Sequence, residues 1–189
     1  MKYFFTLLLI TLLVSACTPQ TQGATEEATE PGDTELRAAP VTSLDSRLLG
    51  NTLNVPGTDA SVAVDTPLLG GELAPFEVGN DKGTLRLLSG GMSVTQGERE
   101  FLVLPVEILR VSGAGGLYLM LLEQTGETMT QRDAQSLGKR LRLLRLELEN
   151  TLITATTVDS RLGKAPDFEV SGGGVMRFRL QGGRLEPVS

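Results

Sequence analysis

The sequence predicts an all-β or β-rich domain, built as an antiparallel sandwich or partly closed barrel with one short helix. The first observation is that, from about residue 46 onward, short apolar runs are separated by pairs of glycines. Glycine adopts the positive φ of tight turns without strain, so such pairs indicate hairpins. The second observation is the alternation of Met176, Phe178 and Leu180 with two arginines, which is typical of a strand with one solvated face.

Strands are expected where apolar runs lie between turn residues. These runs are residues 61–64, 84–88, 92–95, 100–111, 117–123, 140–149, 152–158, 175–180 and 184–188. Residues 101–109 are apolar almost without alternation, which predicts a strand buried on both faces. Pro105 within that run has no N–H to donate, so an edge or a bulge is predicted there. Turns are expected at residues 80–83 and 112–116, which are rich in Gly, Asn, Asp and Ser.

The segment from residue 130 to residue 150 has two interpretations. Thr130 and Asp133 resemble a helix N-cap, so a short helix is predicted over residues 131–137. Residues 140–149 could extend this helix, which would place Leu141, Leu144 and Leu148 on the same face as Leu137. Their alternation of apolar and charged residues instead favours a strand, and the single phase slip at Leu143–Leu144 then requires one bulge.

The N-terminus has the pattern of an export signal. One lysine precedes the apolar run of residues 4–13, and small residues lead up to the one cysteine of the chain. The run is shorter than the roughly 20 apolar residues that a membrane-spanning helix needs, so cleavage and export are expected rather than a span. The frame Val14-Ser15-Ala16-Cys17 resembles the lipobox of bacterial lipoproteins.

The resemblance implies that residues 1–16 are a signal peptide, that the Cys17 sulfur is lipidated, and that acyl chains anchor the protein on the extracytoplasmic side of a bacterial membrane. Two or more acyl chains anchor a protein durably, whereas one gives marginal attachment. Thr18 is not the aspartate that marks inner-membrane retention in enteric bacteria, which favours the outer membrane where a cell has two. The alternative is an ordinary secretory signal cleaved after Ala16, which would leave Cys17 as a free thiol with no second cysteine to pair with.

A polar segment, residues 17–45, separates the predicted anchor from the domain. It is rich in Thr, Glu, Gln, Ala and Pro, and acidic side chains greatly outnumber its single basic residue, Arg37. Such a segment buries too little apolar surface to offset the entropy lost on folding, so it is predicted to be a disordered acidic tether. The globular domain is expected over residues 46–189.

Composition argues against several classes of function. The domain is close to neutral, whereas nucleic-acid binding needs clustered basic residues, so no nucleic-acid partner is expected. The chain has no tryptophan and few tyrosines, which argues against the aromatic platforms of sugar-binding surfaces. It has no histidine, so histidine-based catalysis and the commonest metal ligand are absent. No cofactor or metal site is expected.

The remaining candidate constellations are interpreted as surface features. Ser136 and Lys139 match a Ser-x-x-Lys nucleophile frame, but the partner motifs of that chemistry are missing. Lys139 instead belongs to a solvated basic strip over residues 139–145. Three further carboxylates are expected to be surface charges: Asp159, Asp167 and Glu169.

These patterns predict a lipid-anchored protein of the bacterial cell envelope, with a domain that is a non-catalytic binding or structural module. No catalytic residue is assigned. Its partners are expected to be membrane lipid, through acylated Cys17, and an envelope protein or a lipid-like ligand. The alternative is a carrier or shield for lipid-like ligands, in which a curved sheet keeps an apolar concave face. A cavity lined by Leu and Val would favour the carrier, and a filled interior would favour the module.

Overall fold

A computed structural model describes residues 36–41, 45–64, 73–113, 115–149, 151–160 and 173–189. These ranges consist mainly of antiparallel strands arranged as a sandwich, which confirms the β-rich class. The elements are β1 (Leu36–Pro40), α1 (Asp45–Leu48), β2 (Thr52–Asn54), β3 (Ser61–Ala63), β4 (Leu73–Val78), β5 (Asp81–Leu87), β6 (Met92–Gln96), β7 (Arg99–Arg110), β8 (Gly116–Thr125), β9 (Thr128–Gly138), β10 (Leu141–Glu149), β11 (Leu152–Asp159), β12 (Gly174–Gln181) and β13 (Arg184–Val188).

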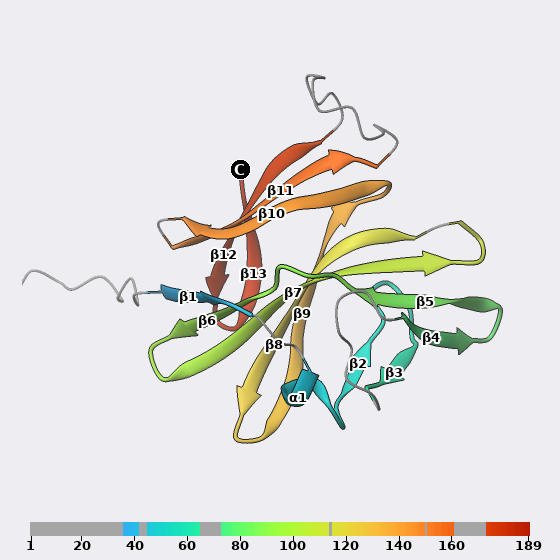
Figure 1. Cartoon of the computed structure of the whole chain (residues 1–189), viewed down its shortest axis with the longest axis horizontal. Coiled ribbons are helices and arrows are strands. Elements are labelled where there is room, and N and C mark those ends of the chain that lie inside the picture. Colours follow the sequence, from blue (N-terminus) through green and yellow to red (C-terminus); the bar gives the residue numbers. More distant parts are fainter. Residues whose placement is uncertain (1–35, 42–44, 65–72, 114, 150, 161–172) are drawn as a thin grey trace, which may run out of the picture. The chain divides into compact units, whose positions relative to one another are not determined.

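The largest sheet is organised around β7 (Figure 1). Along one edge, β7 pairs with β6 through residues 99–103 and then with β5 through residues 106–110. Along the other edge it pairs with β8, which in turn pairs with β9. β1 extends the sheet beyond β6, and β4 extends it beyond β5. The long strand β7 therefore has neighbours on both sides over most of its length.

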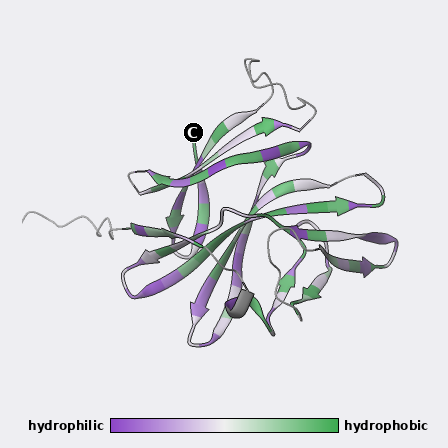
Figure 2. Ribbon diagram, viewed as in Figure 1, coloured by the Kyte–Doolittle hydropathy of each residue, from purple (hydrophilic) through white to green (hydrophobic). Residues whose placement is uncertain are grey.

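Both faces of this central sheet are covered. One face packs against a second sheet, ordered β10-β11-β12-β13, and the other packs against α1 and the β2–β3 hairpin. Successive side chains of β7 enter different cores, because Leu102 and Leu104 face α1 and β2 whereas Phe101 and Val103 face β11 and β12. All four are buried. The predicted burial of this strand on both faces is confirmed, and Figure 2 shows hydrophobic residues along the strands of both sheets.

Pro105 lies at an interruption of the neighbouring strands. The β5 ladder reaches Val106, the β6 ladder begins at Val103, and no strand residue pairs with Pro105 on that side. The carbonyl of Pro105 accepts a hydrogen bond from Leu88 N–H at 2.9 Å. Since β5 and β6 are separated at this point, the missing N–H of proline leaves no ladder partner unsatisfied, which agrees with the predicted irregularity.

The helix predicted over residues 131–137, with its cap at Thr130 and Asp133, is wrong, because this segment lies in β9. β9 pairs with β8 along its length, with two register shifts. Helix propensity and capping are local preferences of small magnitude, and the ladder to a buried strand outweighs them. The Asp133 carboxylate instead accepts a hydrogen bond from Leu185 N–H at 2.8 Å, which ties β9 to β13 of the second sheet.

β10 is a strand, as the alternation favoured, and its register with β11 shifts between Leu143 and Arg145. This irregularity lies at the predicted bulge. Leu143 and Leu146 pack against the core between the sheets. Leu144 is 54% exposed, so the bulge leaves one leucine outside the core.

The C-terminal hairpin confirms the predicted alternation. The three apolar residues face the core between the sheets, and Arg177 and Arg179 are exposed. Gly182 and Gly183 have φ values of 59° and 80° and form the turn between β12 and β13, as the glycine pair predicted. The β4–β5 turn consists of Gly79 and Asn80, so the turn predicted at residues 80–83 lies earlier in the chain, and Asp81, Lys82 and Gly83 belong to β5.

The domain begins before residue 45. Leu36–Pro40 form β1, so the predicted tether over residues 17–45 is too long at its C-terminal end. Most side chains of β1 are exposed, and backbone pairing with β6 holds the strand, which a composition argument does not detect. The remaining part of the predicted tether that precedes β1, and the signal peptide, lie outside the described residues. In the described ranges, no helix is long and apolar enough to cross a membrane.

Candidate functional site

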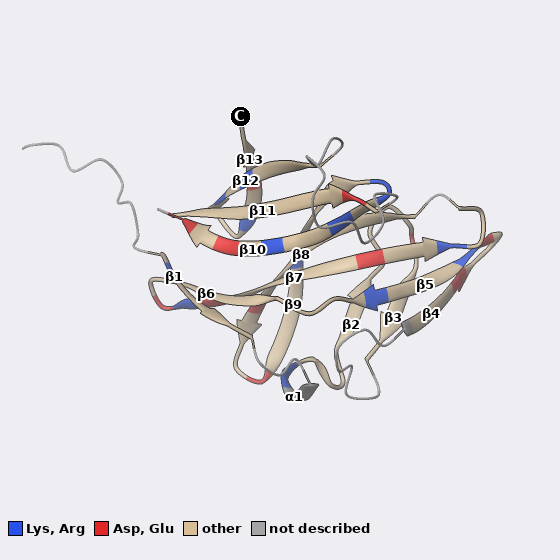
Figure 3. Ribbon diagram, turned by 45° about the horizontal axis from the view of Figure 1, so that its top comes forward, with Lys and Arg blue, Asp and Glu red and all other residues tan. Residues whose placement is uncertain are grey.

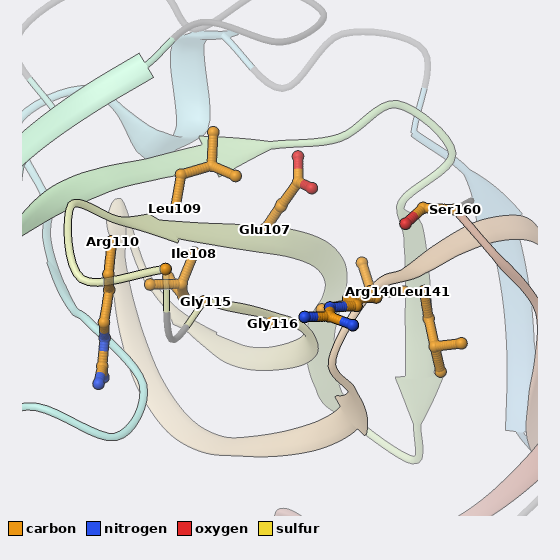
Figure 4. Close-up of a pocket in the computed structure, with 11 residues that line it drawn as sticks. Glu107, Ile108, Leu109, Arg110, Gly115, Gly116, Arg140, Leu141 and Ser160 are labelled. Carbon is orange, nitrogen blue, oxygen red and sulfur yellow. The ribbon is translucent and has the colours of Figure 1, made fainter.

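A surface pocket of about 260 Å³ lies where four segments meet (Figure 4). The end of β7 and the start of β8 form one side of it. The turn between β9 and β10 and the residue after β11 form the other. Its lining residues are Glu107, Ile108, Leu109, Arg110, Gly113, Gly115, Gly116, Leu117, Arg140, Leu141 and Ser160.

The lower part of the pocket is apolar. Ile108 and Leu117 are each 1% exposed and belong to the two different cores beneath it. Leu109 is 43% exposed and Leu141 is half-buried, so these two leucines offer apolar surface at the pocket itself. The pocket therefore combines a buried apolar base with accessible aliphatic side chains.

Glycines allow the loops around the pocket to approach one another closely. A Cβ on Gly115 would overlap the carbonyl oxygen of Ile108, and a Cβ on Gly116 would lie 3.1 Å from that of Gly138. A distance below 3.0 Å is sterically forbidden, so Gly115 cannot be replaced without a backbone shift. The glycine-rich turn predicted at residues 112–116 thus brings the β7–β8 hairpin against the β9–β10 turn.

Arg140 lies at the mouth of the pocket in a backbone conformation that is unusual for its residue type. Its φ is 57°, in the left-handed region that costs a residue with a side chain roughly 1–2 kcal/mol. The carbonyl of Arg140 accepts a hydrogen bond from Ser160 N–H at 2.8 Å, which holds the turn against the end of β11. Lys139 and Ser112 line an adjoining hollow that shares Arg140 with the pocket. Strained residues concentrate at functional sites, so this turn is a candidate functional element.

Replacing Arg140 with glycine tests whether this strain exists. The variant should unfold at the same free energy as the parent or up to about 1 kcal/mol higher, because glycine tolerates the positive φ. Arg142→Gly is the matched control, since Arg142 is an exposed arginine in the extended backbone of β10, where glycine costs about 0.5–1 kcal/mol. Urea unfolding compares the two variants. A larger loss for Arg140→Gly than for Arg142→Gly would contradict the strain.

Acidic groups near the pocket have basic partners of their own. Glu107 lies 3.6 Å from Arg86, and Arg110 lies 3.6 Å from Asp81 and donates to the carbonyl of Gly57 at 2.9 Å. Figure 4 shows the Arg110 side chain directed away from Arg140. These pairs largely cancel the charge of Glu107 and Asp81 at the pocket.

Lys139 and Arg140 differ from those basic residues. Neither forms a side-chain hydrogen bond or ion pair with any residue that the structure describes. Both are exposed, so the predicted solvated basic strip is present at this turn (Figure 3). The turn at the pocket therefore carries two positive charges that no described acidic side chain pairs with.

The Glu123 carboxylate is held between two arginines. Glu123 is 7% exposed, and its carboxylate accepts hydrogen bonds from Arg99 Nε at 2.7 Å and from Arg132 Nε at 2.5 Å. The hydrogen bond from Arg99 and that from Arg132 hold the pKa of Glu123 below its ordinary value, against the opposing effect of burial. A carboxylate that remains ionised between two arginines serves structure rather than proton transfer.

The structure places the sequence-derived candidates as follows. Cys17, Asp167 and Glu169 lie outside the described residues. Ser136 is in β9 and Lys139 is in the following turn, so the Ser-x-x-Lys frame is not on a helix. Asp159 was expected to be a surface charge, but it ends β11 and is buried at 9% exposure, with a partner of its own.

The pocket residues are not singled out as a group by the sequence. The glycine-rich turn and the basic strip were each visible, but as separate surface features. Glu107, Leu109 and Ser160 carried no signal, because their proximity depends on the register of β7 with β8 and on the packing of one sheet over the other.

Among the residues that the structure describes, no three metal-ligating side chains are grouped. The arrangement can bind a small anion beside an apolar surface.

Comparison of the chain with models of protein families, with curated proteins and with solved structures finds no match.

Proposed function

We propose that the protein is a lipid-anchored component of the bacterial cell envelope, with a non-catalytic domain that serves as a binding or structural module. The observation that carries this proposal is the frame of residues 14–17, an apolar run that ends in small residues and the chain's one cysteine. Acylation of Cys17 would give the domain a membrane partner and would account for the single thiol.

The packing of the domain favours the module over the lipid carrier. The carrier needs a sheet face that stays open and apolar, but both faces of the central sheet are packed, and the core side chains of β7 and β8 are almost completely buried. Three pockets formed by described residues open onto the surface. A small surface pocket suits recognition of a small group rather than enclosure of a whole lipid.

Cys17→Ser should abolish membrane attachment, because only a thiol accepts the diacylglyceryl group in this processing route. The variant is expected in the soluble fraction, and the parent in the membrane fraction with acyl mass on its N-terminal residue. Thr18→Ala, which keeps the cysteine, is the control and should pellet with membranes. The proposal fails if Cys17→Ser also pellets and the parent carries no acyl mass.

A further inference from the structure

We propose that the pocket of Figure 4 binds the anionic head group of a small amphiphile, a phosphate or carboxylate carried on a short alkyl chain. This inference rests on the proposed function only in treating the domain as a binding module. It specifies the chemical class of the ligand and the residues that recognise it.

The basic turn at the pocket can attract an anion. The side chains of Lys139 and Arg140 carry no acidic partner within the described part of the chain, and Glu107 is compensated by Arg86 at 3.6 Å. A guanidinium group matches the planar geometry of a carboxylate or phosphate and forms charge-assisted hydrogen bonds to it, and an ammonium group adds a point charge. The mouth of the pocket is therefore suited to an anion.

Two serine hydroxyls near the basic turn are available as hydrogen-bond donors. Ser112 lines the hollow beside Lys139, and Ser160 lines the pocket beside Arg140. The backbone N–H of Ser160 is used by the carbonyl of Arg140, but neither serine hydroxyl forms a hydrogen bond with a residue in the described ranges. Both hydroxyls can donate to anionic oxygens, so each of the two hollows is lined by a neutral donor as well as a cation.

Aliphatic side chains form the apolar surface of the pocket. Leu109 and Leu141 offer accessible surface there, and Ile108 and Leu117 lie beneath it. A site for a free inorganic anion has no need of this aliphatic surface, whereas each methylene that an alkyl group buries would tighten its binding about fourfold. The volume of about 260 Å³ lies just below the range of roughly 300–1,000 Å³ for drug-sized ligands, so a head group and a short alkyl segment fit but a full acyl chain does not.

Two sources can supply this chemistry. One is a soluble alkyl phosphate or carboxylate, and the other is the head group and first methylenes of a lipid in a membrane. Both present an anion next to an apolar chain, and the same residues would recognise either one.

The test uses the whole mature chain with Cys17→Ser, so that the protein is soluble and independent of its anchor. The probes are octyl phosphate below its micelle concentration, inorganic phosphate, and phosphatidylcholine vesicles with and without phosphatidylglycerol. Octyl phosphate should shift the backbone amide resonances of Gly113, Gly116 and Ser160 and bind more tightly than inorganic phosphate. Binding of octyl phosphate without vesicle binding identifies a soluble ligand, and binding of vesicles that contain phosphatidylglycerol identifies a lipid head group.

The decisive variants are matched in charge. Lys139→Gln with Arg140→Gln should weaken binding at least about tenfold, because the charge-assisted hydrogen bonds are lost. Arg177→Gln with Arg179→Gln removes the same charge from the exposed face of β12 and should leave binding unchanged. Equal losses in both double variants, equal affinity for octyl and inorganic phosphate, or no amide shifts at the pocket with octyl phosphate would each overturn the proposal. Such a result would leave the anchor at Cys17 unaffected, since the two experiments share no readout.

Discussion

Phe178→Ala should lower the free energy of unfolding by about 3–5 kcal/mol, since truncating a buried aromatic side chain removes its transfer free energy and leaves a cavity. Phe178 is 3% exposed and lies opposite Ile153 of β11, in the core between the two sheets. The loss is a large share of the about 5–15 kcal/mol that stabilises a typical domain. Urea unfolding of the Cys17→Ser chain measures it directly.

The neighbours of Phe178 on the same strand are its controls. Arg177 and Arg179 are exposed and point to the opposite face of β12, so Arg177→Ala and Arg179→Ala should each change stability by no more than about 0.5 kcal/mol. The backbone pairing of β12 with β11 and β13 is kept in both variants. Equal losses for Phe178→Ala and Arg177→Ala would contradict the assignment of faces on this strand.

Asn51→Ala should lower the free energy of unfolding by about 1–3 kcal/mol, the cost of leaving a buried hydrogen-bonding group unsatisfied. The Asn51 side chain is 8% exposed, and its Oδ1 accepts the backbone N–H of Met129 at 3.0 Å. Its Nδ2 donates to the carbonyls of Arg47 at 3.0 Å and Leu49 at 3.3 Å. One amide therefore joins the segment around α1 to the edge of β9, and alanine supplies neither donor nor acceptor.

Asn54→Ala is the matched control for Asn51. Asn54 is exposed in β2, and its contact with β9 runs from its backbone N–H to Gln131 Oε1 at 2.8 Å, so the substitution preserves that hydrogen bond. Its effect should stay within about 0.5 kcal/mol, as for most surface changes. Amide exchange adds a local readout, because the Met129 amide should lose protection in Asn51→Ala and keep it in Asn54→Ala. Unchanged protection of Met129 in both variants would show that Asn51 does not hold this edge.

Periodic patterns in the sequence were sufficient to predict those strands in which the spacing of apolar residues reflects the buried faces. The alternation in β12 identified its inward and outward faces, and the unbroken apolar run in β7 indicated burial on both sides. The phase slip in β10 located the bulge near Leu144. In each case the spacing of apolar residues along one strand reflects which faces are buried, so neighbouring residues contain the required information.

The sequence by itself therefore determined the β-rich class, most of the strands and the lipobox resemblance at Cys17. Only the tertiary structure decided that residues 131–137 are a strand, that Leu36–Pro40 join the sheet and that Asn51 holds the edge of β9. It also brought the glycine turn and the basic turn together at one pocket. The physical reason is that each of these features depends on hydrogen bonds or packing between residues far apart in the chain, and local propensities are too weak to determine such contacts.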